Sequence, residues 1–129
     1  MKFPTFKNKY FSLEIKEDIL YVDYKEDLII TLPIAKEIVT ERIKFQLQEN
    51  YDSISMIGFL NIKYANKKAR EYLATEGAQR LSAAAFIAEK MVSKTLLQIF
   101  LTVEKPDIPM QVFDDKKNAV AWIQSIINK

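Results

Sequence analysis

Residues 109–127, PMQVFDDKKNAVAWIQSII, contain the clearest structural signal in the chain. Pro109–Phe113 has the length and composition of a short strand. Asp114 and Asp115 follow it, as is typical of the cap at the start of a helix. The next residues repeat apolar side chains at helical spacing, namely Ala119, Val120, Trp122, Ile123, Ile126 and Ile127. The chain therefore closes with a strand followed by a helix, which indicates an alternating α/β fold.

The composition places limits on what the protein can be. The chain has 129 residues, 49% of them apolar, so we expect one folded domain over residues 1–129 with its core between about residues 10 and 127. Histidine and cysteine are absent, which excludes disulfides, thiol nucleophiles, zinc sites built on these residues and imidazole triads. A net charge of +2 gives no general preference for polyanions.

The sequence also gives expectations for location. The first residues lack the apolar core of a signal peptide, because lysines recur and Pro4 interrupts them. Charged residues break the longest apolar stretch, Leu81–Leu101, so we expect no membrane span. These features favour a cytoplasmic protein.

Upstream of the closing unit, the pattern predicts a hairpin and a long helix. Tyr10–Lys16 and Ile19–Tyr24 alternate apolar and polar residues on either side of a Glu17-Asp18 turn. A helix up to about Asn50 should begin after Thr31, whose hydroxyl can cap it, with Pro33 in its first turn. Its apolar face comprises Ile34, Ala35, Ile38, Val39, Ile43, Phe45 and Leu47.

Two further strand–helix units lie between that helix and the closing unit. The first is a buried strand at Ser53–Leu60 with a helix at about Asn66–Glu76, capped by Asn66 and followed by Gly77 as C′ glycine. The second is a strand at Leu81–Ala88, although its alanines also favour helix, and a helix at about Glu89–Val103. This last helix carries Met91, Val92, Leu96, Ile99 and Val103 at helical spacing. The predicted order is ββαβαβαβα, a mixed sheet covered by helices.

No catalytic constellation is visible, and we expect no cofactor. The two glycines cannot form a phosphate loop, and the adjacent acids are turn or cap residues. The one polar cluster is the basic edge, which we define as Lys63, Tyr64, Asn66, Lys67, Lys68 and Arg70. It lies where a strand ends and a helix begins, a common place for ligands and partners to bind. A solvated lysine-rich surface is the alternative interpretation.

The sequence pattern indicates where four aromatic residues lie in the fold. The spacing of Phe113 and Trp122 matches the buried faces of their strand and helix, so we expect core positions. Tyr21 and Tyr24 lie on the hairpin, which could pair with another copy at an exposed edge and form a homodimer.

The order of elements and several motifs resemble a STAS-like domain, the SpoIIAA-like fold of bacterial anti-sigma-factor antagonists. The motifs are Ala69-Arg70 and the closing pattern formed by Pro109, Val112, Phe113, Asp114, Ala119 and Trp122. The resemblance implies a regulatory module that binds a protein partner. In signalling members a phosphorylated serine or threonine begins the second helix, at a place equivalent to Ala65-Asn66 here. Residues 56–74 contain neither serine nor threonine, so we expect the docking surface without the phosphoswitch.

We therefore predict a non-enzymatic interaction module with a protein partner, a possible homodimer, and no nucleic-acid or membrane binding. The alternative function is binding of a small anionic or lipid-like ligand. An enzyme of unfamiliar chemistry is a further alternative, and nucleic-acid binding through the four cations of the basic edge is the least favoured.

Overall fold

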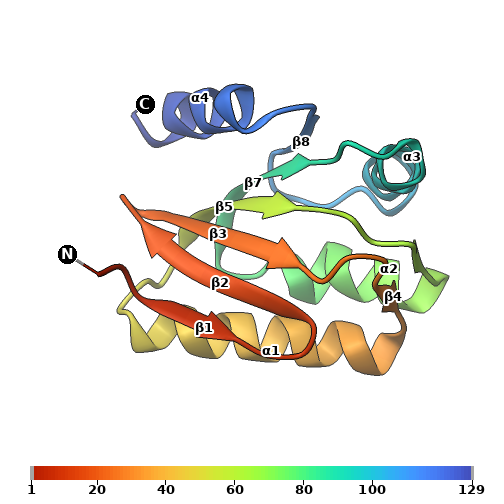
Figure 1. Cartoon of the computed structure of the whole chain (residues 1–129), viewed down its shortest axis with the longest axis horizontal. Coiled ribbons are helices and arrows are strands. Elements are labelled where there is room, and N and C mark those ends of the chain that lie inside the picture. Colours follow the sequence, from red (N-terminus) through yellow and green to blue (C-terminus); the bar gives the residue numbers. More distant parts are fainter. Residues whose placement is uncertain (1, 129) are drawn as a thin grey trace.

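The computed structural model describes residues 2–128, and a six-stranded mixed sheet forms its centre (Figure 1). Across the sheet the strands are β1 (Thr5–Lys7), β2 (Phe11–Lys16), β3 (Ile19–Tyr24), β5 (Ile54–Phe59), β7 (Leu81–Ile87) and β8 (Met110–Phe113). The first three strands are antiparallel, whereas β3, β5, β7 and β8 run parallel. The mixed α/β sheet predicted from the sequence is confirmed.

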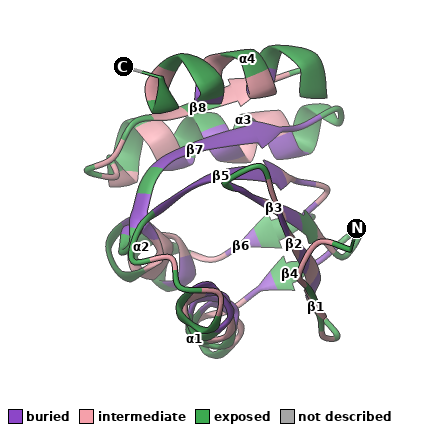
Figure 2. Cartoon of the chain, turned by 90° about the vertical axis from the view of Figure 1, so that its left-hand side faces the viewer, coloured by how far each residue is buried: buried purple, intermediate pink, exposed green. Residues whose placement is uncertain are grey.

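Four helices pack on this sheet: α1 (Leu32–Gln48), α2 (Lys67–Thr75), α3 (Met91–Ile99) and α4 (Lys116–Ile127). In Figure 1, α1 and α2 lie below the sheet and α4 lies above it. Buried side chains of α1, α2 and α3 join the larger hydrophobic cluster on one face, whereas α4 contributes Ala119 and Ile123 to a smaller cluster on the other. Figure 2 shows the buried strands between these layers. The sheet is therefore covered on both faces over its parallel half.

The hairpin forms as its turn residues predict. Glu17 and Asp18 both have positive φ values, 52° and 64°, as a tight two-residue turn requires. The register pairs Leu13 with Val22, so the apolar positions of both strands face the larger cluster. Tyr24 also packs there, whereas Tyr21 packs against the smaller cluster. Strand β1 pairs with β2, so the hairpin is not at the edge of the sheet.

Residues Leu81–Ile87 form strand β7, which confirms the prediction of a strand at Leu81–Ala88 although its alanines favour helix. Ala83, Ala84, Ala85 and Ala88 are fully buried in the interior of the protein. Their small side chains occupy both faces of a parallel strand, where α4 packs on one side. Tertiary packing thus outweighs the helical propensity of alanine.

Three short strands were not predicted. Besides β1, the chain forms β4 (Ile29–Ile30) and β6 (Tyr64–Ala65), which pair in a small parallel ladder apart from the main sheet. Runs of two or three residues are too short to show a periodic pattern. This ladder places Tyr64 immediately before α2.

Three local predictions were wrong. Thr31 occupies the N-cap position of α1, but its hydroxyl makes no capping hydrogen bond. Gly77 does not adopt the left-handed conformation of a C′ glycine; it lies in a short 3₁₀ turn, Glu76–Ala78, and Arg80 has the positive φ of 62°. Leu47, predicted on the apolar face of α1, is exposed.

The prediction for α3 was wrong in a way that bears on function. The helix starts at Met91 and is followed by a π-helical turn at Phe100–Glu104. Of the apolar face predicted for it, four side chains are exposed: Met91 by 73%, Val92 by 61%, Ile99 by 41% and Val103 by 65%. Ser93, Leu97 and Phe100 are buried in their place, because the Ser93 hydroxyl donates to the Ile62 carbonyl at 3.0 Å and fixes the rotation of the helix.

Candidate functional site

The basic edge assembles around the start of α2. Asn66 is the N-cap, and its side-chain oxygen accepts a hydrogen bond from the Ala69 amide at 2.9 Å, as predicted. The N-terminus of α2 is therefore already capped by a neutral side chain. Asn66 stands at the place where the resemblance expects a phosphorylated residue.

The four cations of the basic edge separate into two kinds. Lys63, Lys67 and Lys68 are exposed and form no ion pair with any other residue between 2 and 128. Arg70 is different, because its Nε lies 2.5 Å from Glu104 Oε1 and its Nη1 donates to the Ala65 carbonyl at 2.7 Å. The lysines are thus available to a partner, whereas Arg70 joins α2 to the end of the π-helical turn.

Glu104 is the buried acid of this pair, with a side chain only 4% exposed. Its Oε2 is buried and has no hydrogen-bond partner within the described part of the chain. The π-helical turn ends at this residue, and Lys105 follows in the left-handed conformation with φ of 49°. The turn thereby directs Glu104 toward Arg70 across 34 residues of sequence.

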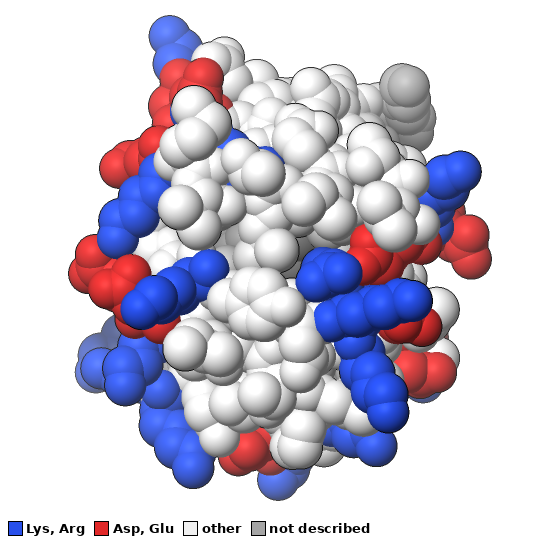
Figure 3. Space-filling view, turned by 90° about the vertical axis from the view of Figure 1, so that its right-hand side faces the viewer, with Lys and Arg blue, Asp and Glu red and all other residues white. Residues whose placement is uncertain are grey.

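An exposed apolar groove lies beside the basic edge. It has a volume of about 300 Å³ and is lined by Lys63, Tyr64, Met91, Val92, Thr95, Leu96 and Ile99; we call it the α3 groove. Tyr64 is 52% exposed, so the groove joins β6 to the outward face of α3. Figure 3 shows this side of the molecule, where uncharged side chains form a strip with basic side chains on both sides of it.

Lys90, just before α3, and Lys94 on it are each paired with acidic side chains. Lys90 Nζ lies 3.1 Å from Glu26 Oε1 and 3.6 Å from Asp27 Oδ1. Lys94 pairs with Asp114 at 2.6 Å. The hydrogen bond to Glu26 raises the pKa of Lys90 above its ordinary value. The unpaired positive charge that lines the groove therefore comes from Lys63, and Lys67 and Lys68 follow it at the start of α2.

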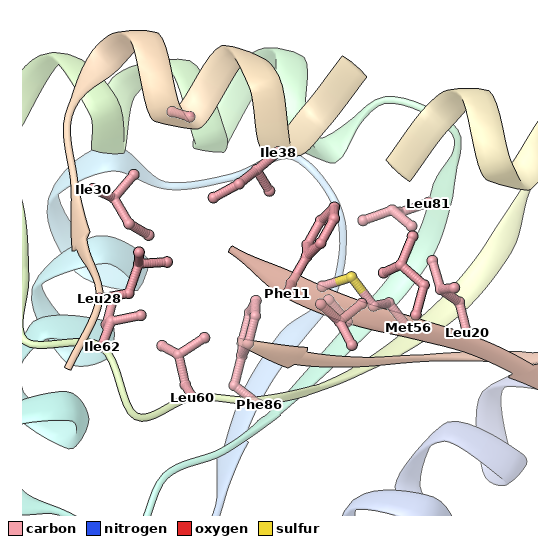
Figure 4. Packing of buried hydrophobic residues seen from close by; sticks show 14 of the residues in the cluster. Phe11, Leu20, Leu28, Ile30, Ile38, Met56, Leu60, Ile62, Leu81 and Phe86 are labelled. Atoms are coloured by element: carbon pink, nitrogen blue, oxygen red, sulfur yellow. The ribbon is translucent and has the colours of Figure 1, made fainter. Parts of the chain in front are cut away.

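A small cavity lies behind the groove, inside the larger hydrophobic cluster. Its volume is about 80 Å³, and its lining is apolar except for Tyr24 and Arg70; we call it the core cavity. Figure 4 shows part of this lining, with Ile30, Ile38, Met56, Leu60 and Phe86 directed toward one another from different elements. Leu96 lines both the core cavity and the α3 groove. One side chain thus contributes to the wall of both spaces.

The sequence profile of a family described as a domain of unknown function, DUF7793, matches residues 13–127. The chain belongs to the DUF7793 family. No curated protein matches it. Among solved structures, an uncharacterised DUF3478-family protein from Shewanella loihica PV-4 with a SpoIIAA-like fold is similar, with a TM-score of 0.58 and 13% identity. The match covers 91% of this chain and 97% of that one, and it confirms the predicted SpoIIAA-like fold.

Within residues 2–128 of the DUF7793 chain, no group of three or more acidic side chains is arranged to hold a metal ion. None of the helices that the structure describes is long and apolar enough to cross a membrane. The groups that the site offers are therefore apolar side chains and lysine ammonium groups. Such groups suit binding through contact area and charge.

The sequence alone indicated the lysines of the basic edge, whose role stays a prediction, but it did not indicate the α3 groove. The missed signal was an excess of apolar positions on α3: residues 91, 92, 99 and 103 as well as 96, 97 and 100. A helix that buries only a narrow stripe leaves some of these residues outside. The buried pair of Arg70 and Glu104 had no local signal, because its members are far apart in sequence.

Proposed function

We propose that this DUF7793 chain is a non-enzymatic regulatory module that binds a protein partner through the α3 groove and the three unpaired lysines of the basic edge. The observation that carries the proposal is the exposure of Tyr64, Met91, Val92 and Ile99 on one continuous surface. Contiguous exposed apolar side chains with a polar rim are typical of protein-binding sites. The residue that caps α2 is Asn66 and not a serine or threonine, which supports docking without phosphorylation at that position.

A protein occupant is favoured over a small ligand by size. The core cavity, at about 80 Å³, is well below the roughly 300–1,000 Å³ of ordinary ligand pockets. The α3 groove is larger but lies open on the surface. An anionic or lipid-like ligand would leave much of its apolar surface in water there.

The test is native mass spectrometry of the tagged protein, purified gently from its own host. We expect a stoichiometric protein partner that is lost in Val92→Asp, because a carboxylate in the groove would be desolvated without a partner. The double variant Lys67→Glu with Lys68→Glu should bind more slowly and with a changed dependence on salt. Ile127→Asp is the matched control, since Ile127 is exposed on α4 away from the groove.

The alternative outcomes are distinct. A bound small mass in place of a protein would favour the ligand function. A dimer of this chain that dissociates in Val92→Asp would make a second copy the occupant. A partner retained equally by Val92→Asp and by the control would refute docking at the α3 groove.

A further inference from the structure

Leu96 separates two apolar spaces that together suit one anchored side chain. The outer space is the α3 groove, of about 300 Å³, and the inner one is the core cavity, of about 80 Å³. Leu96 lines both and is only partly buried. A rotamer change of this one side chain would therefore open the cavity to the groove.

The volume of the core cavity is similar to that of one side chain. Its volume is of the order of the space that one large aliphatic residue vacates in a protein core. Met56 and Met110, whose flexible thioethers adapt to irregular space, line it together with branched and aromatic residues. The lining is apolar except for Tyr24 and for Arg70, which is paired with Glu104, so the cavity suits an apolar group of matching size.

The charges near the α3 groove indicate which kind of partner would bind there. Lys63 lines the α3 groove, and Lys67 and Lys68 follow within five residues at the start of α2. All three are exposed and form no ion pair within the described residues, so this side of the groove attracts acidic groups. The groove follows α3 from Val92 to Ile99, about two helical turns, a length that suits a short helix laid alongside it.

We infer that the occupant is an acidic amphipathic helix of a different protein, one large apolar side chain of which displaces Leu96 and fills the core cavity. This inference rests on the proposed docking function and adds the kind of partner and its anchor. A single side chain buried in this mostly apolar cavity would supply most of the binding energy, as in other interfaces. The lysines would orient the helix and speed its association.

The methionines of the chain allow a direct test. Besides Met1 there are three: Met91 lines the α3 groove, and Met56 and Met110 line the core cavity. Met56 is only 5% exposed, so a protein on the outer surface does not reach it. The full chain is produced in its own host with photo-methionine, irradiated, and its cross-linked peptides are mapped by mass spectrometry.

We expect Met91 and Met56 to cross-link to the same segment of one partner, with acidic residues and apolar residues at helical spacing. A cross-link from Met91 alone would overturn the anchor inference and leave the proposed docking function standing. Cross-links to another copy of this chain, or to a basic or non-helical segment, would overturn the stated partner chemistry. No cross-link to any protein would refute both proposals.

A cavity-filling variant provides the second test. Ala65 is 2% exposed and lines the core cavity, so Ala65→Val fills part of it without altering the groove side chains. The yield of the Met91 cross-link should fall at least about tenfold, and the Met56 cross-link should disappear. Ala121→Val, on the exposed surface of α4, is the control and should leave both unchanged. An unaltered Met91 yield in folded Ala65→Val would overturn the anchor inference.

Discussion

Arg42 and Gln46 form a buried polar pair on α1 that holds the loop after α2. Arg42 is 4% exposed and Gln46 is fully buried. Arg42 donates to the Gly77 carbonyl at 2.9 Å and to the Gln79 carbonyl and Gln46 Oε1 at 3.0 Å. Gln46 in turn donates to the Arg80 carbonyl at 2.8 Å. Burial lowers the pKa of Arg42 to about 10, so this charge is held by carbonyl groups in a poorly solvated place.

Replacing Arg42 should therefore destabilise the fold. Arg42→Met keeps the apolar stem but leaves one buried and two partly buried acceptors without their donor, and we expect the free energy of unfolding to fall by about 2–4 kcal/mol. Urea denaturation followed by circular dichroism measures it. Lys44→Met, at an exposed position of the same helix, should change stability by less than about 0.5 kcal/mol. Equal losses in the two variants would contradict the role assigned to Arg42.

Because of Tyr24, we expect the stability of the fold to depend on pH in the alkaline range. Burial raises the pKa of its phenol from 10.0 to about 12. Between these values the folded state keeps a proton that the unfolded state has lost, so this group makes stability fall as pH rises from 10 to 12. Tyr24→Phe should remove this contribution, giving a shallower loss of stability in urea titrations across that window.

Arg42 acts in the opposite direction over the same pH range, because its pKa is lower in the folded state than its ordinary 12.5. The charges of Tyr24 and Arg42 influence each other's pKa, and Tyr24 raises that of Arg42, so the difference between the two proteins reports on this pair. Parallel pH profiles for the wild-type protein and Tyr24→Phe would show that Tyr24 is not buried as described.

Helix α4 is held to the sheet by a narrow set of contacts. Ala119 and Ile123 are fully buried against the alanines of β7 and Ile57 of β5, whereas Ile127 near its end is 42% exposed. Asp115 caps the helix by accepting from the Asn118 amide at 2.8 Å, as its sequence predicted. The attachment of this face of the protein therefore depends on a few apolar side chains.

Ile123→Ala should show that dependence. We expect a loss of about 2–5 kcal/mol in unfolding free energy, from lost transfer energy and the cavity left behind. Ile127→Ala, the same change at the exposed end of the helix, should cost less than about 0.5 kcal/mol. Thermal and urea denaturation compare the two. Similar losses would mean that α4 is not seated as in the structure.

Helix α3 has the opposite character, since it directs much of its apolar surface outward. Buried Ser93, Leu97 and Phe100 hold the helix against the core, and the Arg70–Glu104 pair holds the turn that follows it. The exposed ion pairs of Lys90 and Lys94 add little, while Met91, Val92 and Ile99 remain exposed. An element held in this way can present an apolar surface to a partner without losing its place in the fold.

The two hydrophobic clusters share one sheet, which couples the two faces of the protein. Strands β5 and β7 contribute buried side chains to both clusters. The single tryptophan, Trp122, lies on the α4 side, with its ring centroid 5.8 Å from that of Phe113. Its fluorescence therefore reports on one face, while circular dichroism reports on all helices.

We expect both signals to change with the same midpoint in urea, because removal of either helical layer would expose strands that support the other. Equilibrium denaturation with the two probes on one sample is the measurement. A fluorescence transition at lower urea would show that α4 detaches before the rest, and would contradict the coupling of the two clusters through the sheet.

Local sequence patterns were sufficient to predict the four helices and the five longer strands, but not the short strands β1, β4 and β6. The Glu17-Asp18 turn, the Asn66 and Asp115 caps and the alternation of strands with helices each depend on residues within a few positions of one another. Backbone conformation and capping are decided at that range, so the hairpin and the α/β class could be predicted. The lysines of the basic edge were found for the same reason.

Tertiary structure alone decided which side chains are buried and what they contact. The rotation of α3 places the Ser93 hydroxyl against the Ile62 carbonyl. Arg70 is paired with Glu104, which lies 34 residues away in the sequence. Periodicity shows that a helix has apolar residues but not which of them find a partner in the core. The α3 groove and the core cavity behind Leu96 arise from that distant packing, and so they exist only once the chain has folded.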